Sequence, residues 1–81
     1  MNDQATDQSV LDRIQRLVAE EELLYGHGAP SEADRSRLTK LNVELDQCWD
    51  LLRQRRALRE YGKDPSEAEV RPASVVEKYS G

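Results

Sequence analysis

The first run of apolar residues recurs at the spacing of one face of an amphipathic helix, with charged residues on the other side. Ser9 can cap the start of this helix, because its hydroxyl can accept from the backbone N–H groups of the first turn. The stretch 26–30 supplies a glycine for a left-handed cap and then a proline. The pattern predicts a short helix over about 9–25, after a disordered tail at 1–8. The apolar members are Val10, Leu11, Ile14, Leu17, Val18, Leu24 and Tyr25.

A second apolar series repeats at intervals of three and four residues, which is the alternation of a coiled-coil seam. Ser31 is placed to cap the helix that carries it. No glycine or proline occurs between residues 31 and 61, and Gly62 and Pro65 follow. The pattern predicts a long helix over about 32–60. The seam consists of Leu38, Leu41, Leu45, Cys48 and Leu52.

The loop between these helices is short, so the chain is expected to fold as an all-α, antiparallel helical hairpin over residues 9–62. An extended arm over 63–81 should follow and dock on the hairpin or on a partner. Pro72 can occupy the first turn of a short helix at about 73–79, which cannot be stable alone. The predicted core consists of Val10, Ile14, Leu17, Leu38, Leu41, Leu45, Cys48 and Leu52.

The apolar stripe of the long helix is wider than one partner helix can cover. A broad stripe in a two-helix protein leaves apolar area in water unless another surface covers it. Burial of a few hundred Å² at about 25 cal/mol per Å² is comparable with the whole stability of so small a domain. We therefore expect a homodimer in which two hairpins form a four-helix bundle. The expected interface anchors are Trp49, Leu51, Leu58 and Tyr61.

Charge is unevenly distributed along this 81-residue chain, which has a net charge of −4 at pH 7. The end of the long helix is locally basic, whereas the chain as a whole is acidic, unlike a general nucleic-acid binder. The basic stretch has two interpretations: an anion or phosphate patch, or a solvated helix end with Asp50–Arg53 and Arg56–Glu60 ion pairs. Its members are Arg53, Arg55, Arg56, Arg59 and Lys63.

Three further residues are candidate sites. Cys48 is the only cysteine, so an internal disulfide is excluded, and its place on the seam favours a core role over a redox role. His27 stands alone between two glycines, which is a poor metal-site pattern. Glu21 lies within the apolar stripe and either pairs with an arginine or keeps its carboxylate in water. We expect no cofactor and no metal.

The sequence also gives an expectation for membrane association and cellular location. No apolar run reaches the roughly 18 residues that a membrane span needs, and the amino terminus is acidic and polar. The expectation is a soluble, cytoplasmic protein without membrane contact.

The stretch LDQCWDLLRQRRALREYGK at 45–63 resembles the long first helix of the small all-helical chorismate mutases. In those enzymes arginines and a lysine bind a dicarboxylate. Here the spacing from the LD pair to the RR pair, and from there to GK, is one residue short in each case. The helices that should follow are absent from the last 18 residues, so we expect no enzyme activity.

Three stretches together resemble a family of short actinobacterial helical proteins known only as a domain of unknown function, family 2630. They are LVAEEELLYG at 17–26, LNVELDQCWDLLRQRRALREYGKDP at 41–65 and VRPASVVEKY at 70–79. The resemblance implies no activity, cofactor or partner. It does imply that the VRP segment belongs to the folded unit.

The function expected from the sequence is protein–protein contact by a small accessory protein, as a homodimer with a further, unknown protein partner. The alternative is a nucleic-acid-associated or polyanion-binding factor that uses the arginine-rich helix end. A chorismate-mutase-like helical enzyme is the remote alternative.

Overall fold

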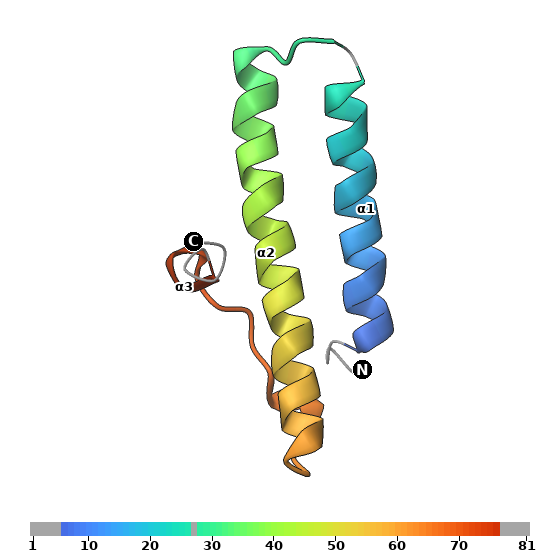
Figure 1. The fold of residues 1–81 in the computed structure, drawn as a ribbon, viewed down its shortest axis with the longest axis vertical. Coiled ribbons are helices and arrows are strands. Elements are labelled where there is room, and N and C mark those ends of the chain that lie inside the picture. The colour runs from blue at the N-terminus through green and yellow to red at the C-terminus, as the bar shows by residue number, and fades with distance from the viewer. Residues whose placement is uncertain (1–5, 27, 77–81) are drawn as a thin grey trace, which may run out of the picture.

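Two antiparallel helices of unequal length form the body of the protein in the computed structural model, which describes residues 6–26 and 28–76. Helix α1 spans Asp7–Tyr25 and helix α2 spans Glu32–Glu60. A 3₁₀ turn, η1, spans Pro65–Glu67, and a short helix, α3, spans Ala73–Val76. Figure 1 shows α1 and α2 side by side, with α2 extending beyond the start of α1. The predicted all-α helical hairpin is confirmed.

Helix α1 begins two residues earlier than the sequence pattern predicted. Thr6 is the N-cap, and its side chain accepts from the backbone N–H of Ser9. The Ser9 hydroxyl in turn accepts from the backbone N–H of Thr6. Because the two side chains cap the helix reciprocally, Ser9 lies inside the first turn and is not the cap. Asp7 and Gln8 therefore belong to the helix, and residues 1–5 of the predicted tail lie outside the described residues.

The other helix ends agree with the predicted ones. Helix α1 stops at Tyr25, and α2 begins after Ser31, which forms the same reciprocal cap with Asp34. Within the connecting loop the left-handed glycine is Gly28, with φ of 92°, whereas Gly26 keeps a right-handed helical backbone. Gly62 supplies the second left-handed turn, with φ of 72°, after α2.

The core lies along the contact between α1 and α2. Six of the eight predicted core residues are buried, and Leu41 is completely buried. Leu45 and Leu52 are half-buried and pack against this cluster, and Leu51 is a buried member of it. The buried cluster consists of Val10, Ile14, Leu17, Leu38, Leu41, Cys48 and Leu51.

Two ion pairs join the helices along one edge of the hairpin. Arg13 Nη2 lies 2.9 Å from Glu44 Oε1, and Arg37 binds Glu20 through two nitrogens, with Nη2 at 2.9 Å from Oε1. The Arg37 guanidinium lowers the pKa of Glu20. Such exposed pairs each contribute only about 0.2–1 kcal/mol, so they select the register of the helices more than they stabilise them.

The carboxyl-terminal arm packs against the side of α2 that faces away from α1 (Figure 1). Gln47 donates to the backbone carbonyl of Arg71 at 3.0 Å. Gln54 both donates to the carbonyl of Glu69 and accepts from its N–H, at 2.7 and 3.2 Å. Val76 in α3 is buried. The arm thus docks on its own hairpin, as the family resemblance implied, and residues 77–79 of the predicted last helix lie outside the described residues.

The described part of the chain contains no helix that is both long enough and apolar enough to span a membrane.

Candidate functional site

The predicted basic cluster is divided by its contacts within the chain. Arg55 is buried, and its Nε donates to Asp7 Oδ1 at 2.6 Å. Its Nη1 lies 3.4 Å from the carbonyl oxygen of Pro65, at the start of η1. Arg59 reaches the same carboxylate, with Nη2 at 2.9 Å from Asp7 Oδ2. These two arginines therefore join the start of α1 to the end of α2, and Arg55 also contacts the arm.

This arrangement changes the acidity of the shared carboxylate. Hydrogen bonds from Arg55 and Arg59 hold the pKa of Asp7 below its ordinary value of 3.8. Asp7 also lies in the first turn of α1, where the helix dipole favours a negative charge. The carboxylate stays ionised at neutral pH and stabilises the contact between the helices.

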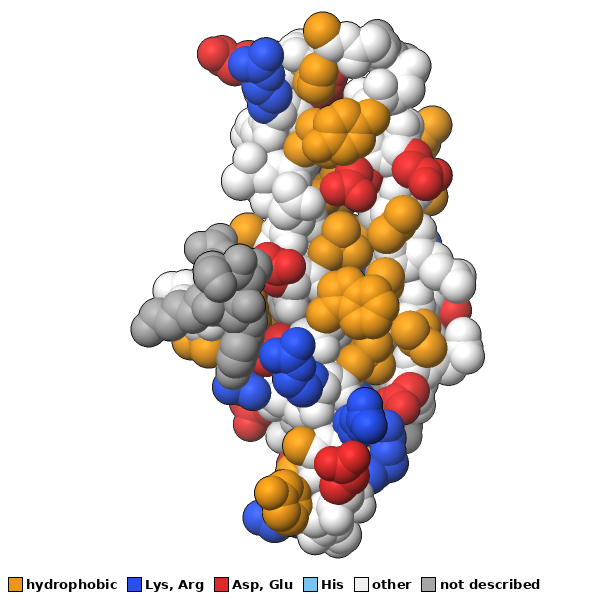
Figure 2. Space-filling model, viewed as in Figure 1, with side chains coloured by type: hydrophobic (Ala, Val, Ile, Leu, Met, Phe, Trp, Pro, Cys, Tyr) orange, Lys and Arg blue, Asp and Glu red, His pale blue; other side chains and the backbone are white. Residues whose placement is uncertain are grey.

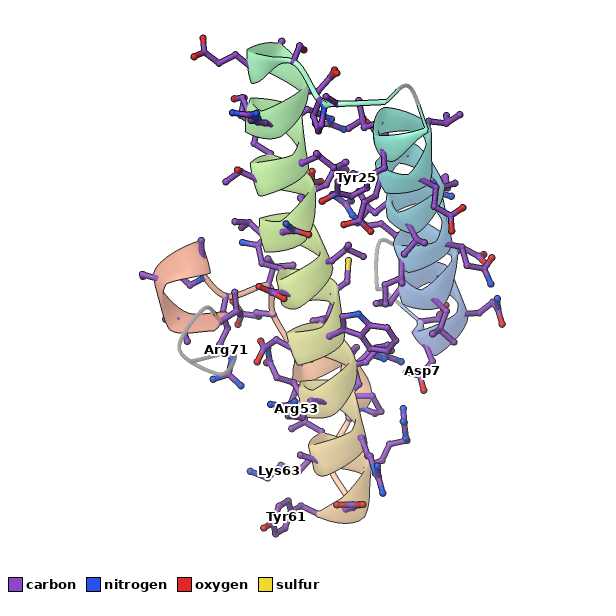
Figure 3. All side chains as sticks on the ribbon, turned by 45° about the horizontal axis from the view of Figure 1, so that its top comes forward. Asp7, Tyr25, Arg53, Tyr61, Lys63 and Arg71 are labelled. Atoms are coloured by element: carbon purple, nitrogen blue, oxygen red, sulfur yellow. The ribbon has the colours of Figure 1, made fainter. Side chains whose placement is uncertain are left out.

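The other three basic residues lie on the exposed part of the same helix end. Arg56 pairs with Glu60 at 3.3 Å, as the sequence predicted, and Arg53 and Lys63 are exposed. Figure 3 shows Asp7 at the start of α1, Arg53 on α2 and Lys63 in the turn that follows α2. Of the two interpretations of the basic stretch, a single anion patch of all five residues does not fit these contacts, because Arg55 and Arg59 bind Asp7.

Asp50, which the sequence predicted to pair with Arg53, binds the carboxyl-terminal arm. Asp50 is only 3% exposed, and its Oδ2 lies 3.1 Å from Arg71 Nε and 2.8 Å from Gln54 Nε2. Its other oxygen is buried without a hydrogen-bond partner among the described residues. Together with Gln47 it forms a polar row on the helix face that holds the arm. The spacing of Gln47, Asp50 and Gln54 was the available signal in the sequence, and it was missed.

The four predicted interface anchors also differ in exposure. Trp49 and Tyr61 are exposed, at 53% and 81%, and Leu58 is half-buried. Leu51 is buried in the chain's own core, so its prediction as an intermolecular anchor is wrong. The reason is the arm: Ala68 packs against the same cluster, so a surface that two helices alone would expose is covered.

One exposed apolar surface extends along both helices. On α1, Leu11, Val18 and Tyr25 are seven residues apart and all exposed, so they share one side of the helix. On α2, exposed Trp49 and half-buried Leu52 lie on the same side of the hairpin. Figure 2 shows apolar side chains gathered along the line where the two helices meet. We call this surface the Trp49 face: Leu11, Val18, Tyr25, Trp49 and Leu52.

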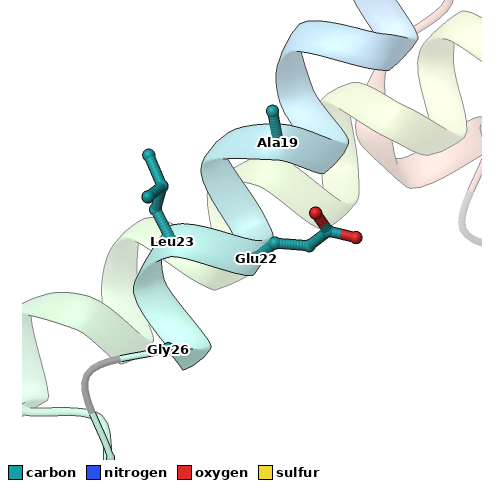
Figure 4. A pocket seen from close by; sticks show the side chains of 4 residues that line it. All are labelled: Ala19, Glu22, Leu23 and Gly26. Carbon is teal, nitrogen blue, oxygen red and sulfur yellow. The ribbon is translucent and has the colours of Figure 1, made fainter.

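Among the described residues, two shallow hollows are open to solvent. One, of about 360 Å³, lies on the Trp49 face and is lined by Trp49, Leu52, Arg53 and Arg56. The other, of about 450 Å³, lies on α1 beside the loop and is lined by Ala19, Glu22, Leu23 and Gly26 (Figure 4). Both hollows are open, and each exposes an apolar side chain beside at least one charged side chain. Their shape suits contact with another macromolecule better than enclosure of a small ligand.

The other candidate residues of the sequence, Cys48 and Glu21, have ordinary structural roles. Cys48 is buried, and burial raises the pKa of its thiol, which keeps it protonated. Glu21 is half-buried at the edge of the apolar stripe. His27 lies outside the described residues. The described residues contain no cluster of three metal-ligating side chains.

Known proteins similar to this chain share nearly its full length. Uncharacterized protein Mb0922c of Mycobacterium bovis and uncharacterized protein Rv0898c of Mycobacterium tuberculosis are each 55% identical over 80 residues, which is 94% of this chain and 92% of the relative. No solved structure matches. The sequence profile of the family described as protein of unknown function (DUF2630) matches residues 6–81, and the chain therefore belongs to that family.

Proposed function

We propose that the protein is a small interaction module that binds another protein chain through the Trp49 face. The observation that carries the proposal is the exposure of two aromatic side chains, Trp49 at 53% and Tyr25 at 56%, on the Trp49 face. Contiguous exposed apolar surface on a soluble domain marks interaction sites, and aromatic residues dominate the energy of protein interfaces.

The surroundings of the Trp49 face support this assignment. The opposite edge of the hairpin carries the Arg13–Glu44 and Arg37–Glu20 ion pairs. The side of α2 that faces away from α1 carries the docked arm. Charged residues flank the Trp49 face, which gives it the apolar centre and polar rim of a protein interface. Binding of a polyanion is less well supported, because Arg55 and Arg59 bind Asp7 and the net charge is −4.

Site-specific photo-crosslinking tests the proposal. Trp49 is replaced by p-benzoylphenylalanine in the full chain, which is expressed in cells and irradiated. Lys40 is the matched control position: it is exposed on α2, and nine residues at 100° each place it half a turn from Trp49.

The expected result is a discrete protein adduct from position 49 and little or none from position 40. Equal adducts from the two positions, or none from position 49, would contradict the proposal. An adduct with nucleic acid in place of protein would also overturn it and would support the polyanion alternative.

A further inference from the structure

On α1, polar residues alternate with the apolar residues of the Trp49 face. Gln15 lies four residues after Leu11 and three before Val18. Glu22 stands in the same relation to Val18 and Tyr25, and both polar side chains are exposed. Alternating steps of four and three residues form the seam of a coiled coil, so this side of α1 suits packing against another helix.

Helix α2 carries a matching seam on the same face. Exposed Arg35 and Asn42 lie fourteen and seven residues before Trp49, so the three side chains share one side of the helix. Leu45 lies three residues after Asn42 and is half-buried. Leu52 lies three residues after Trp49 and is also half-buried. The Trp49 face therefore presents one seam on each helix, and the occupant that fits it is helical.

The ion pairs on the opposite edge show which residues of the two seams are level along the hairpin. Glu20 of α1 binds Arg37 of α2. The helices are antiparallel, so Glu22, two residues further along α1, is level with Arg35, two residues back along α2. Neither of these two side chains forms an ion pair with another described residue. An exposed acid and an exposed base thus lie at one level on neighbouring helices.

Two exposed amide side chains are level in the same way. Arg13 of α1 binds Glu44 of α2. Gln15 and Asn42, again two residues further along α1 and two residues back along α2, are therefore level with each other. Each amide can both donate and accept a hydrogen bond. A polar residue within an apolar seam fixes the register of the helices that pack there.

We propose that the occupant of the Trp49 face is a second copy of this chain, packed face to face with both loops at the same end. The inference rests on the proposed function and names its partner. The twofold axis of this dimer runs parallel to the helices, so α1 of each copy packs on α2 of the other in a four-helix bundle. Rotation about this axis keeps every residue at its level. Glu22 of each copy therefore lies against Arg35 of the other, and the two amides meet in the same way.

The apolar ends of the seams also meet in this dimer. Trp49 lies seven residues after Asn42, so it is level with Gln8, one turn from Leu11. Side chains lean toward the amino end of their helix. Because α1 and α2 run in opposite directions, Trp49 of one copy and Leu11 of the other lean toward each other. The exposed indole is thereby buried against an apolar side chain.

Charge selects between the two face-to-face arrangements. With loops at opposite ends, α1 would lie on α1 and α2 on α2, so Arg35 would not meet Glu22. With loops at the same end, Arg35 of each copy meets Glu22 of the other, and Glu21 adds a second acid beside it. Complementary charges across an interface fix its orientation.

The arrangement also keeps the basic ends of the two long helices apart. In a four-helix bundle of this topology the two α2 helices lie diagonally opposite each other, about 14 Å apart for helices packed about 10 Å from their neighbours. Asp7 and Glu60 of the same chain bind three of the arginines at this end. These arginines are Arg55, Arg56 and Arg59.

The dimensions of the hairpin suit such a dimer. The chain measures 47 × 29 × 19 Å, and the view down its shortest axis shows the Trp49 face. The 19 residues of α1 give an overlap about 28 Å long, and two helices are about 20 Å wide, so the projected contact is about 560 Å². Smaller specific interfaces bury about 600 Å² on each partner, so the face is large enough for a reversible dimer.

A mixing experiment tests the arrangement. Sedimentation equilibrium measures the dimer dissociation constant of the wild-type chain, Glu22→Arg, Arg35→Glu and an equimolar mixture of these two variants. In either variant alone, both symmetric contacts carry like charges. In a mixed dimer, both contacts pair an acid with a base. Since the compensating charge comes from the other copy, a contact within one copy cannot produce this rescue.

Each variant alone is expected to raise the dissociation constant roughly threefold to thirtyfold, because two exposed contacts change. The mixture should regain the wild-type value within about twofold. Both side chains are exposed, so each variant should keep its helical content, which circular dichroism checks. Variants that dimerise like the wild type, or a mixture no tighter than its components, would overturn the arrangement.

Lys40→Glu is the matched control. It makes the same charge change as Arg35→Glu on the side of α2 away from the Trp49 face, and it should leave the dissociation constant unchanged. When it replaces Arg35→Glu in the mixture, one of the two contacts still carries like charges, so the mixed dimer should stay weaker than the wild type. Full rescue by Lys40→Glu would show that net charge, and not the Glu22–Arg35 contact, controls association.

A wild-type chain that stays monomeric at several hundred micromolar would overturn the second copy as the occupant. With the second copy as occupant, the crosslinked adduct from position 49 has twice the mass of the chain. If the purified chain is monomeric while position 49 still crosslinks to a different protein in cells, the present inference fails and the proposed function stands.

Discussion

At the scale of single residues, Asp7 joins parts of the chain that are distant in sequence. Its carboxylate contacts Arg55 and Arg59, which are 48 and 52 residues away. Arg55 also reaches the carbonyl of Pro65 and so links three segments. A charge run in a sequence shows that a helix end is basic, but it does not show which acid approaches it. The role of these two arginines could therefore not be predicted from their spacing alone.

Asp7→Asn tests this contact through its pH dependence. The pKa of Asp7 is lower in the folded chain than the ordinary 3.8, so its stabilisation is fully present above that value and is lost as pH falls through the lower, folded value. We expect the variant to be about 1 kcal/mol less stable at pH 7. The difference should shrink below pH 4, because protonated Asp7 no longer pairs with the arginines. Urea unfolding between pH 2.5 and 7 measures both effects.

The control for that measurement is Asp12→Asn in the same helix. Asp12 accepts a hydrogen bond from Gln8 but contacts neither arginine. Its substitution should therefore change stability less than Asp7→Asn does. A loss of stability by Asp7→Asn that persists undiminished at pH 2.5 would show that the ion pair is not its cause.

At the scale of elements, side chains of α2 hold the arm by hydrogen bonds to its backbone. They bind the backbone groups that a neighbouring strand would bind in a sheet. Gln54 donates to the carbonyl of Glu69 and accepts from its N–H, so one amide side chain satisfies both backbone groups of that residue. Asp50 and Gln47 bind the following Arg71 through its guanidinium and its carbonyl. These polar contacts hold an extended segment in place although it has few apolar side chains to bury.

Gln54→Met should release this part of the arm while preserving helix α2. Methionine has a similar length and helix propensity but cannot replace the two hydrogen bonds to Glu69 or the one to Asp50. We expect a loss of about 0.5–1 kcal/mol and faster hydrogen exchange of the Glu69 amide, read by NMR. Gln15→Met, at an exposed position of α1, is the matched control and should change neither. Unchanged exchange at Glu69 would contradict the described role of Gln54.

The elements differ in how well the sequence predicts them. Helices α1 and α2 were predicted closely because apolar spacing reports directly which face is buried. The start of α1 was wrong by two residues because Thr6 and Ser9 are both good caps, and only their reciprocal hydrogen bonds decide between them. The sequence did not determine where the arm docks, because docking depends on polar side chains of α2. The partners of such side chains leave no periodic pattern in the sequence. Leu51 was misassigned for the same reason.

At the scale of the whole molecule, the hairpin is asymmetric about the plane of its two helices. One edge carries ion pairs between α1 and α2, the far side of α2 carries the arm, and the Trp49 face keeps its apolar side chains in contact with water. A domain of 81 residues has a small core, so covering that face would add a substantial fraction to its stability. The homodimer that the sequence predicts would therefore couple folding to association.

That coupling predicts a thermal midpoint that depends on chain concentration. For a dimer that dissociates as it unfolds, each tenfold rise in concentration adds about 1.4 kcal/mol per dimer. With an unfolding entropy of about 2.1 cal/mol/K for each of roughly 162 residues, the midpoint should rise by about 4 °C. Circular dichroism between 5 and 500 µM measures the shift. Trp49→Ser should lower the midpoint and reduce its concentration dependence, because it removes the largest apolar contact of the face while leaving the buried core intact. A midpoint that is constant over this range would instead mean that the hairpin and its arm are stable as a monomer and that association contributes nothing to folding.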